Sequence, residues 1–491
     1  MIEAEVISIK VIEPKVVELV QRGARLVSVF GAADAHGKRV IHYIVEHRNS
    51  EKNAEYLSFL ADAEGTVPSL TRVAPGAAWA EREAHELYGI DITGHPDLRP
   101  LLLHDGEAAN SHPPNRQFRA AVTEPYEFME VGGVGVCEVA VGPVHAGIIE
   151  PGHFRFSVVG DRVINLELRH FYTHKGTETL FEGNDPADAV PIAESVSGDN
   201  CLSHAVAYSQ AVEQAYEIVV PPRAESIRAV GLEIERLLAH IGDFGALCGD
   251  VGFAVAAAYA SGLKETLLQA SMKAVGTRYW RGIAAPGGVR RDLDATSARE
   301  LARVVRTVCS DFKALAQDSL NTPSVQNRFE ETGILRKKAA RDLGVVGPVA
   351  RASGISMDVR RDHPYGAYRG LSFEVPTTHY GDVMARAKIR VEEASISAHL
   401  IASLIAGLPD GPVFVEHTFK GSHEGYASVE SPRGELFYWV ETREGRLSRC
   451  HVRSPSFQNW PALPLAMPDN IIADFPLINK SFNLSYSGCD R

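Results

Sequence analysis

The stretch PPRAESIRAVGLEIERLLAHIGD, residues 221–243, has the pattern of one long helix. Pro222 stands at a plausible first helical position, where the amide that proline lacks is not needed. The apolar residues recur at i, i+3, i+4 and i+7 spacing, which places them on one face of a helix. They are Ile227, Val230, Ile234, Leu237, Leu238 and Ile241. The stretch therefore predicts a helix whose apolar face is buried.

The sequence on both sides of this stretch completes a mainly helical unit. Residues 382–406 predict a second helix, which ends at Gly407 and buries Ile389, Ile396, Leu400 and Leu404. Upstream, residues 152–172 alternate like two strands around a turn at Gly160 and Asp161. A further β-element is expected between residues 413 and 452. We expect a large helical domain with short β-elements.

The first hundred residues have a different character. The β-branched runs VISIKVIE (6–13), RLVSVFGA (25–32) and RVIHYIVEH (39–47) predict strands in a small α/β domain, with a hairpin turn at 34–38. Periodicity disappears between residues 104 and 124. We therefore expect an α+β protein with a small domain at 1–115, a linker at 116–137 and a large domain at 138–491.

Composition excludes several classes of protein. The net charge of -12 repels phosphate backbones and argues against nucleic-acid binding. The longest charge-free stretches, 251–263 and 394–409, are shorter than the roughly 18 to 20 apolar residues that cross a bilayer. No export signal is expected at the N-terminus. No two of the six cysteines form a C-x-x-C pair, so zinc ribbons and ferredoxin-type clusters are not expected.

Residues 79–103, WAEREAHELYGIDITGHPDLRPLLL, resemble the signature of the C-type subunit of bacterial complex I, the NADH-quinone oxidoreductase. Glu81, Arg82 and Glu83 are expected to begin an amphipathic helix. Gly94, His95 and Pro96 are expected to form a turn that carries a charged strip outward. In the family this strip docks on neighbouring subunits, so the resemblance implies the same role here.

From residue 141 the chain resembles the large subunit of energy-converting NiFe hydrogenases of the formate hydrogenlyase type, which complex I shares as its D-type subunit. The resemblance rests on the segments 142–156, 172–180, 204–213, 233–243, 346–368, 407–413 and 489–491. It implies that a domain like the C-type subunit of complex I is fused to a domain like the NiFe-hydrogenase large subunit.

The resemblance fails where a nickel–iron centre would be held. In the family two C-x-x-C pairs supply four thiolates. Here the first pair falls on Ser197 and Asn200 in SVSGDNCLSH (195–204), and the second on Ser485 and Gly488 in NLSYSGCDR (483–491). Hydroxyl groups are poor substitutes for soft thiolates, so we expect no metal in this chain. Cys201 and Cys489 lie one residue beyond motif positions, and a helical step would turn them about 100° away.

The quinone partners of complex I are altered as well. The resemblance places its quinone-binding histidine at Ile149 and its tyrosine at Ile192, and neither isoleucine side chain can hydrogen-bond a quinone. Glu150 matches the hydrogenase carboxylate that passes protons from the metal. Residues 358–368 resemble complex I more than the hydrogenases, so the chain combines sequence features of both.

A set of polar residues in these motifs is the predicted proton-relay and cavity cluster. Glu and His relay protons, and Arg holds a buried carboxylate. For a relay, Glu150 should be poorly solvated and bonded to a histidine or to an arginine from 351–361. Taken singly, each residue also fits a structural role. The candidates are His145, Glu150, His153, Arg351, Arg361, Asp362 and His363.

The sequence thus predicts a subunit of a membrane-associated, complex I-like or hydrogenase-related oxidoreductase that couples electron transfer to proton or ion translocation. Two alternatives stay open: a non-catalytic scaffold that joins iron-sulfur and membrane arms, and a quinone-site subunit. No cofactor is expected in the chain itself, whereas an iron–sulfur cluster is expected in a small neighbouring subunit and a quinone is a candidate ligand. Expected partners are that subunit and the membrane arm, on the cytoplasmic side of the inner membrane.

Overall fold

The computed structural model describes residues 5–34, 37–50, 53–104, 126–146 and 149–491. Its N-terminal part is a four-stranded sheet in the order β1-β4-β3-β2, in which only β1 and β4 run parallel. The strands are β1 Glu5–Val6, β2 Arg25–Ala33, β3 Arg39–Ser50 and β4 Asn53–Asp62, with helices α1 Ile9–Gln21 and α2 Ala78–Tyr88, the 3-10 turn η1 Pro75–Ala77, and the parallel pair β5 Thr66–Pro68 and β6 Asp91–Thr93. The expected small α/β domain is confirmed.

One of its predicted strands is wrong. Of residues 6–13 only Val6 belongs to a strand, as the last residue of β1, and the chain enters α1 at Ile9. The buried residues Ile12, Val16 and Leu19 follow helical spacing that extends beyond the eight-residue run. The β-branched residues of this short run favour a strand, and the helical spacing becomes visible only over a longer stretch. The hairpin predicted between the next two runs is present as β2 paired with β3.

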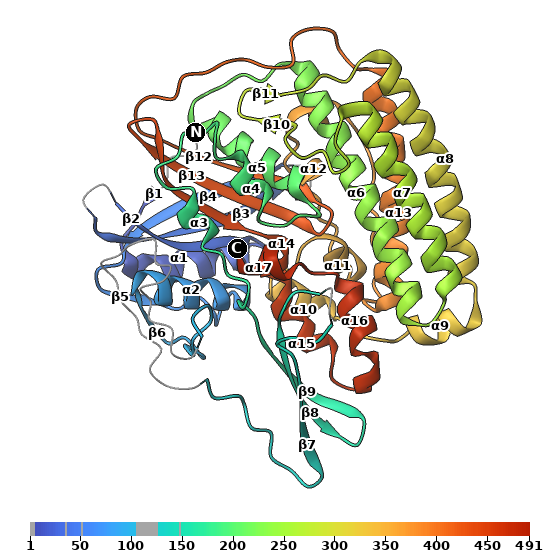
Figure 1. Ribbon diagram of the computed structural model, residues 1–491. Helices are drawn as coiled ribbons and strands as arrows, with labels where there is room; N and C mark the ends of the chain where they lie inside the picture. The colour runs from blue at the N-terminus through green and yellow to red at the C-terminus, as the bar shows by residue number, and fades with distance from the viewer. Residues whose placement is uncertain (1–4, 35–36, 51–52, 105–125, 147–148) are drawn as a thin grey trace.

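A three-stranded antiparallel sheet follows and projects from the body of the molecule (Figure 1). Its strands are β7 Val136–Val141, β8 His153–Val159 and β9 Arg162–Arg169. The two strands predicted around Gly160 and Asp161 are β8 and β9. Residues 105–125, which contain the first part of the expected linker, lie outside the described residues, so the three domain boundaries stay predictions.

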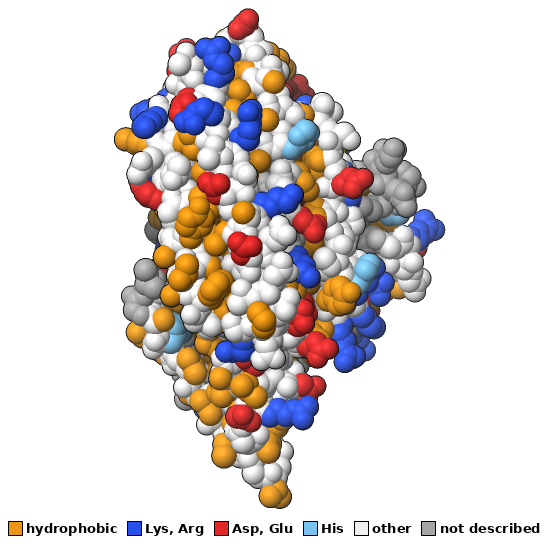
Figure 2. Space-filling view, turned by 90° about the vertical axis from the view of Figure 1, so that its right-hand side faces the viewer, with side chains coloured by type: hydrophobic (Ala, Val, Ile, Leu, Met, Phe, Trp, Pro, Cys, Tyr) orange, Lys and Arg blue, Asp and Glu red, His pale blue; other side chains and the backbone are white. Residues whose placement is uncertain are grey.

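Four long helices form a bundle along one side of the molecule (Figure 1). They are α6 Pro222–Asp250, α7 Ala254–Val275, α8 Ala295–Leu320 and α13 Val383–Ala406. The two long helices predicted from the sequence are α6 and α13. Asp294 caps α8 and Asp382 caps α13 by accepting backbone amide hydrogen bonds. Figure 2 shows apolar side chains interspersed with charged ones over this helical face.

A second three-stranded sheet lies between the N-terminal sheet and the bundle. Its strands β12 His423–Ser431, β13 Gly434–Arg443 and β14 Arg446–Arg453 are antiparallel and contact α5 Cys201–Ala215. Side chains of both sheets meet in one apolar cluster of Val27, Phe30, Ile44, Tyr56, Phe437 and Trp439. The β-element expected at 413–452 is this sheet, and the α+β class is confirmed.

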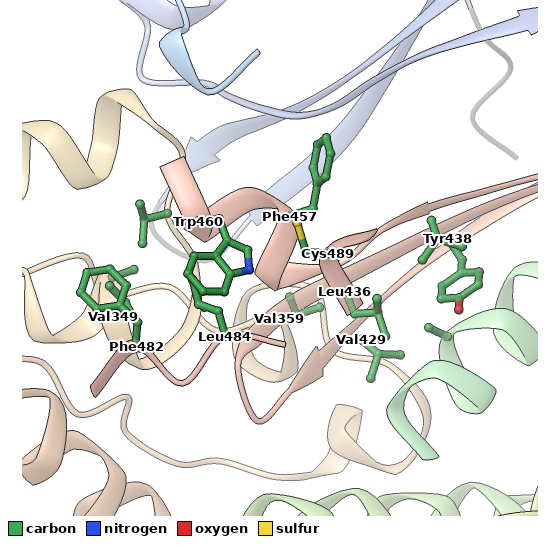
Figure 3. Close-up of a cluster of buried hydrophobic side chains, with 14 of the residues drawn as sticks. Val349, Val359, Val429, Leu436, Tyr438, Phe457, Trp460, Phe482, Leu484 and Cys489 are labelled. Atoms are coloured by element: carbon green, nitrogen blue, oxygen red, sulfur yellow. The ribbon is translucent and has the colours of Figure 1, made fainter. Parts of the chain in front are cut away.

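Short helices, 3-10 turns and the antiparallel strand pair β10–β11 complete the described chain. They are α3 Thr177–Leu180, α4 Val190–Glu194, β10 Ala284–Ala285, β11 Gly288–Val289, α9 Pro323–Phe329, α10 Lys337–Asp342, α11 Gly347–Ala352, α12 Val359–Asp362, η2 Gly366–Gly370, α14 Pro455–Asn459, η3 Trp460–Ala462, α15 Leu463–Ala466, η4 Ile472–Asp474, α16 Phe475–Phe482 and α17 Tyr486–Asp490. The C-terminal segment is part of the core: Leu484 and Cys489 point into a buried cluster with Phe457 and Trp460 (Figure 3). Within the described ranges, no helix is long and apolar enough to span a membrane.

The charges near the start of α2 are buried, whereas Asp97 and Arg99, which follow the turn at 94–96, are 32% and 31% exposed. Glu81, Arg82 and Glu83 are only 2%, 8% and 7% exposed. Glu81 accepts hydrogen bonds from the Ser69 hydroxyl and the Leu70 amide, both at 2.6 Å, and Glu83 pairs with Arg491 at 2.7 Å. The part of the strip on α2 is therefore not free to dock, because its charges have partners within the same chain that an amphipathic pattern does not reveal.

Candidate functional site

A cavity of about 400 Å³ lies between the C-terminal segment, the loop before α5 and the turn between β12 and β13. We call it the C-terminal cavity. Its lining is mostly polar and consists of Ile149, Glu150, Ser197, Gly198, Asp199, Arg433, Asn479, Lys480, Asn483, Leu484, Ser485, Tyr486 and Ser487. The fold brings residues from four distant parts of the sequence to one hollow.

The positions that match nickel ligands in the family meet at this cavity. Ser197 Oγ lies 3.0 Å from Ser485 Oγ, and Ser485 accepts a hydrogen bond of 2.8 Å from the Gly488 amide. A Cβ atom on Gly488 would lie 3.4 Å from Ser197 Cβ. Asn200 is buried at the start of α5, where its side-chain oxygen faces Arg433 at 3.4 Å. Hydroxyl and amide groups stand where a thiolate set would be, so these residues do not fit a nickel–iron centre.

The two neighbouring cysteines do not replace the missing ligands. Cys201 is fully buried and its thiol contacts the Tyr279 carbonyl at 3.3 Å, while burial raises its pKa to about 12. Cys489 is also fully buried, in the apolar cluster of Figure 3, and burial raises its pKa well above the usual range. Neither cysteine is among the residues that line the C-terminal cavity. In the part of the chain that the structure describes, no three His, Cys, Asp or Glu side chains converge to hold a metal.

One ion pair forms a wall of the cavity. Arg433 donates to Asp199 Oδ1 at 3.0 Å and makes a second, shorter bond to its other oxygen. The side chain of Asp199 is 51% exposed at the cavity wall; partial desolvation there would raise its pKa, but the guanidinium of Arg433 lowers it to about 2. Asp199 also accepts from the Ser197 hydroxyl at 2.9 Å. This pair therefore fixes one of the two serines that face each other.

Glu150 lies on the opposite wall but is not buried as expected. Its carboxylate is exposed and accepts a hydrogen bond of 2.7 Å from the Ser487 amide. Lys175 donates to the Ser487 hydroxyl at 2.6 Å, and burial lowers the pKa of this lysine although Glu150 opposes the shift. Among the described residues, the expected bonds from Glu150 to a histidine of its own segment or to an arginine of 351–361 are not present. A backbone amide holds the carboxylate instead.

His145 and His153 lie on the same chain segment as Glu150. His145 packs against Phe154 and Tyr486 with ring centroids 5.6 and 6.0 Å away, and its Nε2 has no hydrogen-bond partner among the described residues. His153 Nδ1 lies 3.1 Å from the Gly142 carbonyl. Burial lowers the pKa of both histidines. Both therefore favour the neutral imidazole form.

The other predicted candidates lie elsewhere, so the single polar cluster expected from the sequence is wrong. Arg351 is fully buried and pairs with Glu393 and Glu430. Arg361 pairs with Asp362 at 2.8 Å. His363 lies 3.0 Å from Glu46 and stacks on Tyr56 at 4.1 Å between centroids. The segment 351–363 packs against the bundle and the N-terminal sheet, and none of its residues is among those that line the C-terminal cavity.

The two altered quinone positions are separated. Ile149 lines the C-terminal cavity, whereas Ile192 is half-buried on α4 and packs against the core. Sequence reasoning missed Asp199, Lys175 and Ser487, although all three lie within the quoted motifs between or beside named positions. Arg433 follows a strand in a turn and gave no local signal.

Comparisons with known proteins agree with the fold. The family model of the 30 kDa subunit of respiratory-chain NADH dehydrogenase matches residues 14–124, and that of the 49 kDa subunit matches 250–422 and 418–491. The model of nickel-dependent hydrogenases matches residues 175–278. Both halves of the resemblance are therefore found in the expected order.

Individual relatives cover almost the whole chain. Formate hydrogenlyase subunit 5 of Escherichia coli is 34% identical over 97% of this chain and 87% of its own length. Hydrogenase-4 component G of Escherichia coli is 32% identical over 93% and 81%. A chain of an archaeal respiratory complex, the membrane-bound sulfane sulfur reductase, superimposes with a TM-score of 0.69 and 27% identity over 73% of this chain and 99% of its own. The chain therefore belongs to the family of large subunits that energy-converting hydrogenases share with complex I, in the form that carries a 30 kDa-type domain ahead of the 49 kDa-type domain.

Proposed function

We propose that this chain is the cavity-bearing peripheral subunit of a membrane-associated oxidoreductase complex that couples electron transfer to proton or ion translocation, without a nickel–iron centre of its own. The observation that carries this proposal is the Ser197–Ser485 hydroxyl pair, 3.0 Å apart, at the position of the family's metal site. Hydroxyl groups line the cavity at two of the positions where the resemblance places metal ligands. Its relatives include subunits of formate hydrogenlyase and of NADH-quinone oxidoreductase.

Within the cavity, we assign proton transfer to Glu150. Its carboxylate is oriented by the Ser487 amide and lies near the Lys175 ammonium group. In the isolated chain it is exposed, and a partner that covers the cavity would desolvate it and so favour proton uptake. His145 and His153, both favouring the neutral form, supply proton acceptors on the same segment. Arg351, Asp362 and His363 are too far removed in the fold to join this step.

The partner expected over the cavity is a small iron–sulfur subunit, whose cluster would supply the electrons. The membrane arm would bind another face, on the cytoplasmic side of the inner membrane. Exposed apolar residues on α7, namely Val255, Tyr259 and Met272, and on the projecting sheet, namely Val159 and Ile164, are candidates for these contacts. Since α2 buries its charges, the part of the 81–99 strip that is available for docking is its exposed end with Asp97, Leu98 and Arg99.

The structure bears on the two alternative functions, the scaffold and the quinone-site subunit. The scaffold function is favoured by the internal pairing of the cavity's polar groups, because Arg433 bonds Asp199 and Lys175 bonds Ser487. A quinone would gain no hydrogen bond from Ile149 or Ile192 and would need new partners. Transport measured in the whole complex separates the first function from the scaffold.

The test of complex membership is isolation of the tagged chain from membranes of its own host. We expect a small iron–sulfur protein and membrane-spanning subunits to copurify in fixed ratio, and the membrane fraction to lose the chain when those subunits are deleted. A chain that purifies alone, or that stays on membranes without any partner subunit, would contradict the proposal.

A further inference from the structure

A group of buried charges lies between α6, α13 and β12, away from the C-terminal cavity. We call it the buried charge network. Each member is at most 2% exposed. The members are Glu233, Arg236 and His240 of α6, Arg351, Asp358 and Arg360 of the segment around α11 and α12, Glu393 of α13 and Glu430 of β12.

The network is continuous. Arg351 donates to Glu393 at 2.7 Å and to Glu430 at 2.9 Å, and it lies 3.5 Å from Asp358. Arg360 bonds Asp358 at 2.6 Å and Glu233 at 2.9 Å. His240 lies 2.8 Å from Glu393, and Arg236 lies 3.5 Å from Glu233. A change of charge on any member therefore acts on the others at close range in a weakly screened interior.

The charges in the network do not balance when every carboxyl group is ionised. The carboxyl groups are four, Glu233, Asp358, Glu393 and Glu430, and the guanidinium groups are three, Arg236, Arg351 and Arg360. An uncompensated buried charge is costly. The network is neutral when it holds one proton, either on His240 or on a carboxyl group.

The surroundings assign that proton to Glu430. Burial lowers the pKa of His240 despite its bond to Glu393, so the imidazole stays neutral. For Glu233, Asp358 and Glu393 burial is outweighed by arginines that lower each pKa. For Glu430 burial and Asp358 together outweigh Arg351, Arg236 and Arg360 and raise the pKa to about 7.

The local contacts of Glu430 to arginine are weaker than those of Asp358. One carboxyl oxygen faces Arg351, and the other accepts a hydrogen bond of 3.0 Å from the Val359 amide. Its own backbone amide donates to the Tyr365 hydroxyl at 3.2 Å. Among the described residues no arginine binds it through two nitrogens, in contrast to Asp358, which Arg360 holds in that way.

We propose that Glu430 is a proton-binding site in the core, which takes up one proton as a carboxylic acid and returns it as a carboxylate plus a proton. Its position between two cavities suits this role. Tyr365 also lines a second cavity of about 580 Å³ beside Tyr56, Tyr426 and Glu225. Toward the C-terminal cavity, Asn483 bonds Asp243, which pairs with Arg390 at 3.0 Å. Asp243 and Arg390 stand three residues from His240 and Glu393 on the same helices, about 4.5 Å along the axis.

Infrared titration of the full-length chain tests the site directly. We expect the carbonyl band of a protonated carboxyl group to disappear as pH rises through neutrality, and this band to be missing in Glu430→Gln. Glu235 is the matched control, because it is buried on α6 with a pKa also raised to about 7 but bonds Leu202 and Ser203 outside the network. Glu235→Gln should remove a different band and keep the first. Identical spectra for wild type and Glu430→Gln would overturn the proposal.

A second variant tests the charge count itself. Asp358→Asn leaves three carboxyl groups against three guanidinium groups, so Glu430 should ionise without penalty. We expect its band to titrate at least one pH unit lower than in wild type, which is a tenfold change in proton affinity. An unchanged titration would show that the excess of carboxyl over guanidinium groups is not what keeps Glu430 protonated.

The role of this proton in the complex rests on the proposed function. In vesicles that contain the whole complex, Glu430→Gln should transfer electrons but move at least tenfold fewer protons per electron, while Glu235→Gln should behave as wild type. Proton movement at the wild-type ratio in Glu430→Gln would overturn the coupling role of the site. A wild-type complex that moves no protons would defeat the proposed function instead, and the infrared result would still decide whether Glu430 binds the proton.

Discussion

At Ser197 and Ser485, two hydroxyl groups face each other 3.0 Å apart where the family resemblance implies thiolates. The replacement changes what the position can do. A serine hydroxyl stays protonated at neutral pH and acts as donor and acceptor, whereas a thiolate is a soft metal ligand. The pair also links Asp199 to the Gly488 amide through a short chain of hydrogen bonds. These residues now order the cavity wall.

The first prediction concerns metal content. Because none of Ser197, Asn200, Ser485 and Gly488 offers a thiolate, and Cys201 and Cys489 are buried away from the cavity, the isolated complex should contain no stoichiometric nickel. Elemental analysis of the complex purified from membranes measures this. About one nickel per chain would contradict it.

At the scale of elements, the long helices are positioned by close contacts that a sequence pattern does not display. Gly231 of α6 lies against Leu202 and the Trp280 ring, so that a Cβ atom at this position would come within 2.6 Å of both. This approach lets α6 lie close to α5. The same helix carries the buried charges of the network on its other residues, so its position determines their geometry.

The second prediction tests this contact. Gly231→Ala should lower the free energy of unfolding by about 1 to 3 kcal/mol, because overpacking outweighs the gain in helix propensity. Gly262→Ala on α7 is the control, since nothing lies within 4 Å of its Cβ position. The control should be neutral or more stable by about 0.5 to 1 kcal/mol. Denaturant unfolding measures both, and equal effects would refute the packing argument.

At the scale of the whole molecule, buried ion pairs join the N-terminal sheet to the large domain. Glu435 of β13 is fully buried and accepts from Arg453 at 2.6 Å, from the Tyr56 hydroxyl at 2.8 Å and from Arg25 at 2.7 Å. Arg25 and Tyr56 belong to the N-terminal sheet. Burial alone would raise the pKa of Glu435, but Arg25 and Arg453 hold it well below its usual range.

The third prediction concerns these ion pairs between the N-terminal sheet and the large domain. Glu435→Gln leaves the buried Arg453 guanidinium without a carboxylate partner, while Arg25 keeps Glu46 at 2.9 Å, and it should cost about 3 to 5 kcal/mol of stability at neutral pH. Because the folded-state pKa is depressed, the stabilisation exists above the unfolded pKa of about 4.3 and disappears as pH falls through the folded pKa. The difference between wild type and variant should therefore shrink in acid. Glu300→Gln, which breaks an exposed pair on α8, should leave the unfolding midpoint unchanged.

The sequence predicted the regular elements well where a pattern was long. The stripe of α6, the Gly407 stop of α13 and the turn at Gly160 are local signals, and each element is present. The run at 6–13 failed because eight residues, even when rich in β-branched side chains, are too few to distinguish a strand from the first turns of a helix.

The site was predictable only in part. The motif positions Ser197 and Ser485 do meet, because the resemblance carries three-dimensional information. The partners of Glu150 and Arg351 were wrong, since pairing between segments 200 or more residues apart, or 42 residues apart for Arg351 and Glu393, depends on packing that no local pattern encodes. The sequence did not predict the burial of charged side chains, either on α2 or in the buried charge network.

The most direct test of the proposed function is redox-driven proton transport in membrane vesicles that contain the whole complex, measured for wild type, Glu150→Gln and the control Glu138→Gln. Glu138 is a carboxylate of β7, outside the C-terminal cavity, that pairs with Arg155. Glutamine keeps the shape of Glu150 and its bond from the Ser487 amide but removes its titration. We expect normal assembly of all three, with transport lost at least tenfold only in Glu150→Gln. Wild-type transport in Glu150→Gln would contradict the proposed function and favour the scaffold.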